Sequence, residues 1–196
     1  MKAVYVRASK NRGYTVLGVD SGEGARAYTV PDSLYVQIGS PLGGTELDDG
    51  DFSAVTLADE IFRATKKALS LLAYADNNLY SLKMKLRRAG FSKEAADQAV
   101  AEMQRDGYVN EQRQLERLVL REVRAKLTGP RLIIPKLLAK GYKRDDIESA
   151  LDTLLSDGQI DFEQAKETLI RKKFGDSASH EDIKKLLYKH GFNTYD

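Results

Sequence analysis

The chain has 196 residues, of which 42% are hydrophobic and 31% are charged, and its formal net charge is +2. This composition is typical of a globular protein with a real core, and no stretch approaches the roughly 18 apolar residues of a membrane span. The absence of cysteine excludes disulfides and thiolate metal sites, and two histidines leave few ligands for any other metal site. The N-terminus has no long apolar run, so we expect no signal peptide and a cytoplasmic location. We also expect the protein to have no cofactor.

The small net charge conceals an uneven distribution along the chain. Residues 1–60 carry 5 basic and 9 acidic side chains, residues 61–127 carry 14 and 8, and residues 128–196 carry 12 and 12. The middle of the chain therefore holds the positive charge. Positive potential concentrated in one segment can attract a polyanion or an acidic protein groove, although an ordinary solvated helical surface would have the same composition.

The first 40 residues have the composition of strands. Their β-branched and aromatic runs are separated by glycine and proline, the residues that mark turns. We predict a small antiparallel module with hairpin turns near 11–13 and 21–24, followed by a loop or linker at 39–50. The runs assigned to strands are 4–6, 14–17, 27–30 and 34–36.

A short sequence motif that occurs three times is the strongest indication of the fold. In each copy a basic, leucine-containing segment ends in a glycine followed by an aromatic residue. The glycines Gly90, Gly141 and Gly191 are 51 and then 50 residues apart. A fixed period of this size indicates a repeat architecture, in which stacked helical units bury one another's apolar faces. We therefore predict a mostly α fold of tandem three-helix repeats behind a β-rich N-terminal module.

The spacing of apolar residues changes from 2 to 3.6 at about residue 57, where the first helix of the repeats is predicted. The chain divides into a strand-rich module and linker (1–56), two full repeats (57–109 and 110–160) and a truncated third repeat (161–196). Each long helix closes one repeat and opens the next. The predicted helices are 57–74, 79–88, 93–106, 110–127, 162–174 and 181–190, with equivalents of the second and third in repeat 2, and their N-caps are Asn78, Ser92, Asn110 and Asp161.

Pro135 leaves one helix boundary open. It lies where Met84 and Lys185 lie in the other repeats. If its helix begins at Pro130, the proline removes an interior hydrogen bond and should kink the helix near residue 131. If the helix begins later, Pro135 falls in the first turn, where proline is tolerated.

Sequence patterns for catalysis are missing. There is no nucleophile elbow, His-Glu-x-x-His, phosphate loop or Rossmann fingerprint. The glycine-rich segment 39–44 lacks the lysine of a phosphate loop, and 48–51 lacks the ligand spacing of a calcium loop, so an ordinary loop and an acidic turn before a helix are favoured. His180 and His190 are expected at a helix start and a helix end, on the surface. We expect a binding protein and not an enzyme.

The long helix 110–127 carries a basic stripe. Arginines at 113, 117, 121 and 124 follow a 4, 4, 3 spacing on one face, and Glu116 and Glu122 offset only part of their mutual repulsion. Such a surface suits a phosphate backbone or an acidic protein groove, and the alternative is a solubilising face with scattered ion pairs. Tyr74, Tyr80 and Tyr108 are weaker candidates for exposed contact. The candidate contact residues are Lys83, Arg87, Arg113, Arg117, Arg121, Arg124 and Arg131.

A spaced pattern of segments runs across both full repeats, at 68–72, 82–91, 106–110, 119–124, 129–131 and 137–142. This pattern resembles the RecX family of bacterial recombinase regulators. The resemblance covers about residues 60–192, and the strand-rich extension is similar to that of some longer members. The chain departs from the family pattern in the lack of basic residues at 77–81, in the proline at 135 and in the short third repeat.

The resemblance implies a function that the repeats alone do not. RecX proteins bind the RecA recombinase filament on single-stranded DNA, lie in its helical groove and inhibit filament growth, ATP hydrolysis and strand exchange, and some contact the DNA. It implies Arg121, Arg124 and Arg131 as the best contact candidates, and we expect a monomer with no membrane partner. A stand-alone nucleic-acid-binding protein is the rival interpretation, and a scaffold whose acidic N-terminal module recruits another protein is a third.

Overall fold

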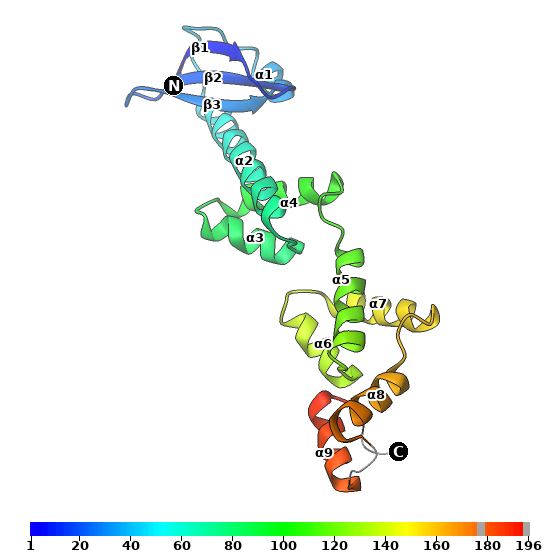
Figure 1. The fold of residues 1–196 in the computed structure, drawn as a ribbon. Helices are drawn as coiled ribbons and strands as arrows, with labels where there is room; N and C mark the ends of the chain where they lie inside the picture. The colour runs from blue at the N-terminus through cyan, green and yellow to red at the C-terminus, as the bar shows by residue number, and fades with distance from the viewer. Residues whose placement is uncertain (176–178, 194–196) are drawn as a thin grey trace. The chain divides into compact units, whose positions relative to one another are not determined.

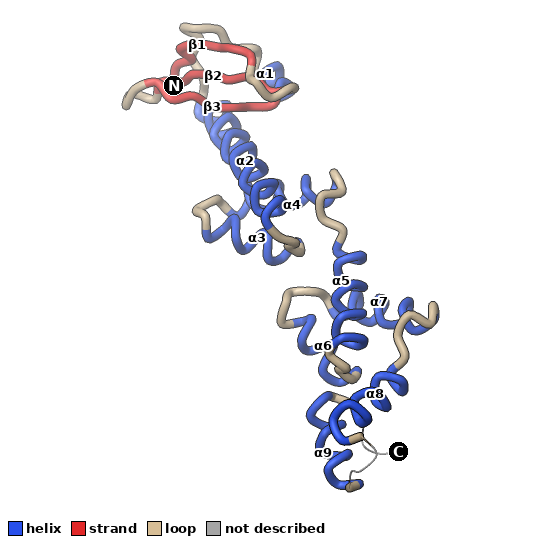
Figure 2. Tube along the Cα trace, viewed as in Figure 1, coloured by secondary structure: helices blue, strands red, loops and turns tan. Residues whose placement is uncertain are grey.

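The computed structural model describes residues 1–175 and 179–193, and its elements are drawn in Figures 1 and 2. These residues form two compact units. One consists of Met1–Asn77 with Leu82–Tyr108, and the other of Asn78–Ser81 with Val109–Asp196. The fold class is the predicted one, mostly α with a small antiparallel sheet at the N-terminus. None of the helices in the described ranges has the length and apolarity needed to cross a bilayer.

The sheet of the first unit has three antiparallel strands in the order β1-β2-β3, which are β1 (Lys2–Ala8), β2 (Tyr14–Asp20) and β3 (Ala25–Pro31). Three of the four predicted strands and both predicted hairpin turns are therefore confirmed. Gly13 closes the first turn with φ of +82°, a conformation that costs glycine little.

The fourth predicted strand, 34–36, is wrong. These residues lie in α1 (Asp32–Gln37), a short helix that begins directly after Pro31. An apolar run of three residues has no period of its own, so packing decides between strand and helix. In a helix, Leu34, Tyr35 and Ile38 can all pack against the buried side chains of the sheet, and they do so here.

The first long helix, α2 (Asp49–Tyr74), begins eight residues before the predicted start at 57. Its N-cap is Asp48, whose Oδ1 accepts a hydrogen bond of 2.7 Å from the amide of Asp51. The predicted loop 39–50 therefore ends in the acidic turn expected before a helix. The early start lets Val55, which is fully buried, pack against the sheet.

The sheet and α2 are joined by a buried carboxylate. Asp59 of α2 is 6% exposed, and its Oδ1 accepts a hydrogen bond of 2.9 Å from the amide of Thr29 in β3. Its Oδ2 accepts one of 2.9 Å from Nε of Arg63. β3 is an edge strand, so the amide of Thr29 has no partner strand on that side, and Asp59 provides the hydrogen-bond acceptor that it would otherwise lack.

The rest of the first unit is helical. α3 (Leu79–Arg88) has its first turn in the second unit, and α4 (Lys93–Arg105) packs against α2. Ser92 caps α4 as predicted, and both its amide and its hydroxyl donate to the carboxylate of Glu60, at 2.6 and 2.7 Å. Burial alone would raise the pKa of Glu60, but these hydrogen bonds outweigh burial and lower it.

The second unit consists of helices that share one core. Its predicted caps are confirmed: Asn110 accepts from the amide of Arg113, and Asp161 accepts from those of Glu163 and Gln164. The core is built from apolar side chains of every element, among them the fully buried Leu115, Val119, Ile133 and Ile147. The elements are α5 (Glu111–Leu120), the π-helical η1 (Arg121–Ala125), α6 (Pro130–Leu138), α7 (Arg144–Ser156), α8 (Phe162–Phe174) and α9 (His180–His190).

Two details differ from or complete the sequence prediction. The helix predicted as continuous over 110–127 is α-helical only to Leu120 and then π-helical. α6 begins at Pro130, so Pro135 lies inside the helix and not in its first turn. His180 and His190 lie at the two ends of α9, as predicted.

Candidate functional site

Three arginines of the predicted stripe lie along α5 and the start of η1. Arg113, Arg117 and Arg121 are exposed, at successive positions i, i+4 and i+8. Helical residues four apart are neighbours on one face, so the three guanidinium groups share a side of the helix. The nearby carboxylate of Glu116 accepts a hydrogen bond of 2.8 Å from Gln112. This helix therefore presents a row of positive charge to solvent.

The fourth arginine of the stripe has a different role. A π-helix has more residues per turn than an α-helix, so η1 rotates Arg124 from the position that a continuous α-helix would give it. The guanidinium of Arg124 donates to the carbonyl oxygen of Gln159, with Nε at 2.8 Å. Arg124 and Gln159 also line a small cavity of about 310 Å³. Arg124 therefore ties η1 to the loop between α7 and α8.

Glu122 does not neutralise the arginine row, because it points into the protein. It is 3% exposed. Its carboxylate accepts hydrogen bonds from Lys126 at 2.5 Å, from Lys136 at 3.1 Å and from Thr128 at 3.3 Å. Burial would raise the pKa of Glu122, but the hydrogen bonds and charges of Lys126 and Lys136 outweigh it and lower the pKa. In the sequence Glu122 lies among the arginines, but in the structure its carboxylate bonds to Lys136 and so joins η1 to α6.

Arg131, in the first turn of α6, lies over an aromatic ring. Its guanidinium carbon is 5.3 Å from the centroid of Tyr188 in α9, and both side chains are exposed. The sequence analysis missed Tyr188. Its partner is in another repeat, and no local pattern connects the two residues.

The two candidates of the first unit already have partners. Lys83 forms an ion pair with Asp97 of α4, in which each side chain is 38% exposed. Nη1 of Arg87 donates a hydrogen bond of 3.0 Å to the carbonyl oxygen of Phe91. Both side chains remain partly accessible, but part of their bonding capacity holds α3 and the segment after it in place.

The predicted exposed tyrosines are confirmed as exposed. Tyr74, Tyr80 and Tyr108 are 93%, 54% and 59% accessible. Tyr142 and Phe192, expected in the repeat core, are 8% and 3% exposed.

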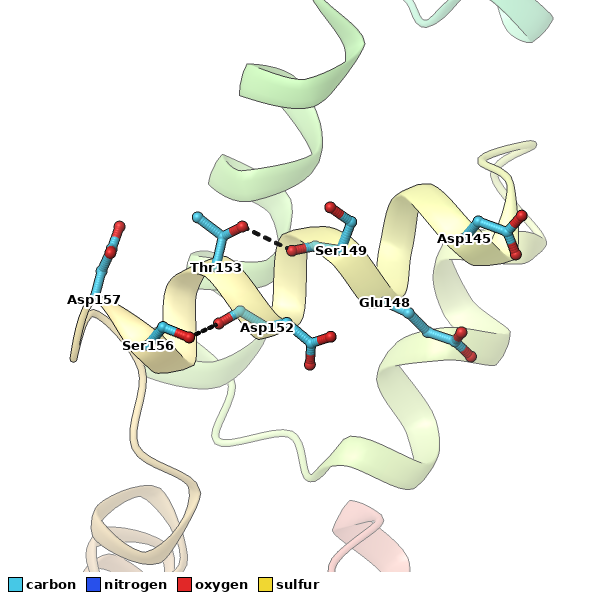
Figure 3. A pocket seen from close by; sticks show the side chains of 7 residues that line it. All are labelled: Asp145, Glu148, Ser149, Asp152, Thr153, Ser156 and Asp157. Atoms are coloured by element: carbon cyan, nitrogen blue, oxygen red, sulfur yellow. Dashed lines mark hydrogen bonds between the residues drawn. The ribbon is translucent and has the colours of Figure 1, made fainter.

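The outer face of α7 has the opposite charge to the arginine row. Figure 3 shows the side chains of Asp145, Glu148 and Asp152 along this helix, where they line a shallow depression of about 640 Å³. Glu148 accepts a hydrogen bond of 3.2 Å from Arg144 one turn away. Within the described ranges, no group of three or more histidine or acidic side chains is arranged to hold a metal ion. The second unit therefore has a basic and an acidic surface, and the basic one suits a polyanion.

No family model matches the sequence, but curated relatives do. A protein named regulatory protein RecX from Ectopseudomonas mendocina is 35% identical over 120 residues, which cover 61% of this chain and 77% of that protein. One of the same name from Leuconostoc mesenteroides subsp. mesenteroides is 25% identical over 170 residues, which cover 85% of this chain. That match spans 63% of the Leuconostoc protein. The match to another protein of the same name, from Lactobacillus johnsonii, spans 57% of that protein. The chain therefore spans about three fifths of the length of these two relatives.

Solved structures show the same fold. A crystal structure of regulatory protein RecX superposes with a TM-score of 0.72 at 21% identity, covering 98% of this chain and 95% of the other. A crystal structure of RecX from Lactobacillus salivarius superposes with a TM-score of 0.58 at 23% identity, covering 69% and 90%.

Proposed function

The chain belongs to the RecX family, and on that premise we propose that it is a regulator of the RecA recombinase that binds the RecA filament on single-stranded DNA. Bound in the groove of the filament, it lowers ATP hydrolysis and strand exchange. The principal contacts are the row formed by Arg113, Arg117 and Arg121, and Arg131 adds to them from α6.

The observation that carries this proposal is the exposed arginine row on α5 and η1. Like charges at i and i+4 destabilise an isolated helix, and Glu122, the acid nearest Arg121 in the sequence, is turned inward to Lys126 and Lys136. A row of exposed positive charge along one helix suits an anionic partner.

The test is the ATPase activity of RecA on single-stranded DNA, titrated with this protein. We expect inhibition by the wild-type chain, and a loss of potency of about tenfold or more when Arg113, Arg117 and Arg121 are all changed to glutamate, equivalent to about 1.4 kcal/mol of binding. Arg124 is left unchanged, because its bond to Gln159 would confound loss of binding with loss of structure.

A matched control variant shows whether inhibition depends on where the positive charges lie or only on the net charge of the protein. Arg171, Lys172 and Lys173 are exposed in the last turn of α8. Their triple change to glutamate alters the net charge by the same amount. We expect this variant to inhibit within about twofold of the wild-type chain, since only charge near the contact should matter strongly. Absence of inhibition by the wild-type protein at any ratio would exclude the proposed function.

The Arg131–Tyr188 pair favours a second candidate, a stand-alone nucleic-acid-binding protein. Arginine planes and tyrosine rings both stack on unpaired bases, and this pair is exposed. On this alternative, Tyr188→Ala lowers the affinity for single-stranded DNA in the absence of RecA by about 1 kcal/mol or more. If the RecA filament is the partner, Tyr188→Ala inhibits RecA less than the wild-type chain does. In that case the wild-type chain and the variant both bind single-stranded DNA only weakly when RecA is absent.

A further inference from the structure

The three repeat glycines have one backbone conformation but two different environments. Gly90, Gly141 and Gly191 follow the ends of α3, α6 and α9 with φ of +93°, +88° and +82°. This left-handed conformation closes a helix and turns the chain. Gly141 and Gly191 are each covered by another part of the second unit, whereas nothing lies within 4 Å of the place where a Cβ of Gly90 would be.

The start of α3 covers Gly141. The side-chain amide of Asn78 donates a hydrogen bond of 2.9 Å to the carbonyl oxygen of Lys140. A Cβ on Gly141 would come within 2.6 Å of Cγ of Tyr80. All of these residues belong to the second unit. The junction joins the beginning of one helix to the end of its counterpart in the next repeat.

The start of α6 covers Gly191 in the same way. The amide of Gly129 donates to the carbonyl oxygen of His190 at 2.7 Å, and that of Arg131 donates to the carbonyl oxygen of Gly191 at 3.1 Å. A Cβ on Gly191 would come within 2.6 Å of Cγ of Leu132. The first N–H groups and the last carbonyl groups of a helix have no partner within that helix. At these junctions, donors at the start of one helix bond to carbonyl groups at the end of another, so both sets of groups gain partners.

Among the residues that the structure describes, the same contact has one open half at the end of α3 and another at the start of α9. At the Gly90 end of α3, Arg87 and Arg88 are exposed in the last turn. At the other end, the start of α9 corresponds in the repeat to the starts of α3 and α6. It has exposed Glu181 and Asp182 in its first turn, and Glu181 also pairs with Lys185 one turn later, at 2.7 Å. The last turn of α3 therefore has basic side chains and the first turn of α9 has acidic ones.

We propose that these two ends bind each other between copies of this chain, so that the start of α9 of one copy docks on the Gly90 end of α3 of the next. The occupant is a second copy because the chain already makes this contact twice within itself, and because the charges at the open ends are complementary. The contact is heterologous, head to tail, so the same contact can be repeated from one copy to the next.

The area of such a contact limits its strength. A junction of one helix turn is much smaller than the roughly 1,200 Å² of a stable complex, so free copies associate weakly. Copies held side by side on a filament would meet at a high effective concentration, and the contact would then make binding cooperative. This consequence rests on the proposed function, but the contact itself does not.

Site-directed disulfide formation tests the contact without RecA or DNA. The natural chain has no cysteine, so an Ala89→Cys, His180→Cys variant carries one thiol at each open end, both at exposed positions. Under mild oxidation we expect a ladder of covalent dimers, trimers and longer products. Each single-cysteine variant should give only background dimers, and an equal mixture of the two should give dimers above that background. The intrachain pair Leu79→Cys, Lys140→Cys occupies the equivalent positions of an internal junction and tests whether this geometry permits a disulfide.

Charge reversal makes the result specific. Arg88→Glu or Glu181→Arg alone should lower the yield about threefold, as loss of an exposed ion pair of about 0.7 kcal/mol would do, and the two together should restore it. A ladder that is no stronger than in the single-cysteine variants, or one that is insensitive to both charge reversals, would overturn the proposal. Neither result bears on whether the protein binds RecA.

Discussion

The backbone amide of Gly129 donates a hydrogen bond of 2.7 Å to the carbonyl oxygen of His190, which lies at the end of a helix in the next repeat. Gly129 is buried and its φ is −77°, so any residue could adopt its backbone conformation. A Cβ there would come within 2.5 Å of the carbonyl carbon of Gly191. Glycine is required at this position for close approach of two backbones and not for backbone flexibility.

Gly129→Ala should therefore destabilise the protein by about 2 to 3 kcal/mol, since two backbone segments must separate to admit the methyl group. The measurement is urea unfolding followed by circular dichroism. Gly90→Ala is the matched control. It adds a methyl group in open space and should cost only the roughly 1 kcal/mol of a left-handed alanine. Equal losses in the two variants would contradict the assignment of a steric role to Gly129.

Glu122→Gln should remove a pH-dependent part of the stability. The pKa of Glu122 is lowered from its ordinary value of 4.5 by Lys126 and Lys136, which outweigh burial. A group with a lowered folded pKa contributes stability above its unfolded pKa and loses that contribution as the pH falls through the folded pKa. We expect the variant to lose about 1.5 kcal/mol at pH 7, because Lys126 and Lys136 are half exposed and water can replace part of their bonding, and progressively less below pH 4.5. Unfolding at several pH values measures this.

The comparison of the two proteins isolates Glu122 from other carboxylates. Glu60 also has a lowered pKa and is present in both, so its contribution cancels in the difference. A difference in unfolding free energy that stays constant from pH 7 to pH 3 would show that the charge of Glu122 is not what stabilises the η1–α6 junction.

Asp59→Ala should destabilise the N-terminal module by about 2 kcal/mol or more, because the amide of Thr29 then loses its acceptor in a half-buried position. Asp59→Asn keeps an oxygen acceptor and loses only the charge that faces Arg63, a residue whose side chain is 49% exposed. Its cost should be about 1 kcal/mol or less. Hydrogen exchange of the Thr29 amide distinguishes the two variants, and equally fast exchange in both would argue against Asp59 as the acceptor.

The arginine row also predicts how DNA binding depends on salt. If Arg113, Arg117 and Arg121 contact phosphates, changing all three to glutamate makes the plot of log affinity against log salt shallower by about 2, since each contact to single-stranded DNA contributes about 0.7. Fluorescence anisotropy with a labelled oligonucleotide at several salt concentrations gives this slope. The triple change at Arg171, Lys172 and Lys173 should leave it nearly unaltered. An unchanged slope in the arginine variant would place the DNA contacts elsewhere.

Local chemistry made the helices predictable. Capping residues such as Ser92 and Asn110 and left-handed glycines such as Gly90 act on their own neighbours in the chain, so their sequence signals correspond directly to helix ends. One exception was 34–36, where the run is too short for its period to decide and contact with the sheet selected a helix. The early start of α2 and the π-helical end of the long helix were also not predicted.

The candidate site was only partly predictable for the same reason. The spacing of Arg113, Arg117 and Arg121 depends on helix period alone, and the structure keeps it. The roles of Arg124 and Glu122 depend on partners that a linear pattern does not bring near, namely Gln159 across the α7–α8 loop and Lys136 on α6.

By itself, the sequence determined most of the elements, the repeat period and the family, because helix caps, hydrophobic spacing and a 50-residue repeat are properties of neighbours along the chain. Only the tertiary structure decided which charges face solvent and which are used internally, and which repeat glycines are covered. Burial and hydrogen bonding join residues far apart in the chain, and the free energy of each polar group depends on the partner that folding brings to it.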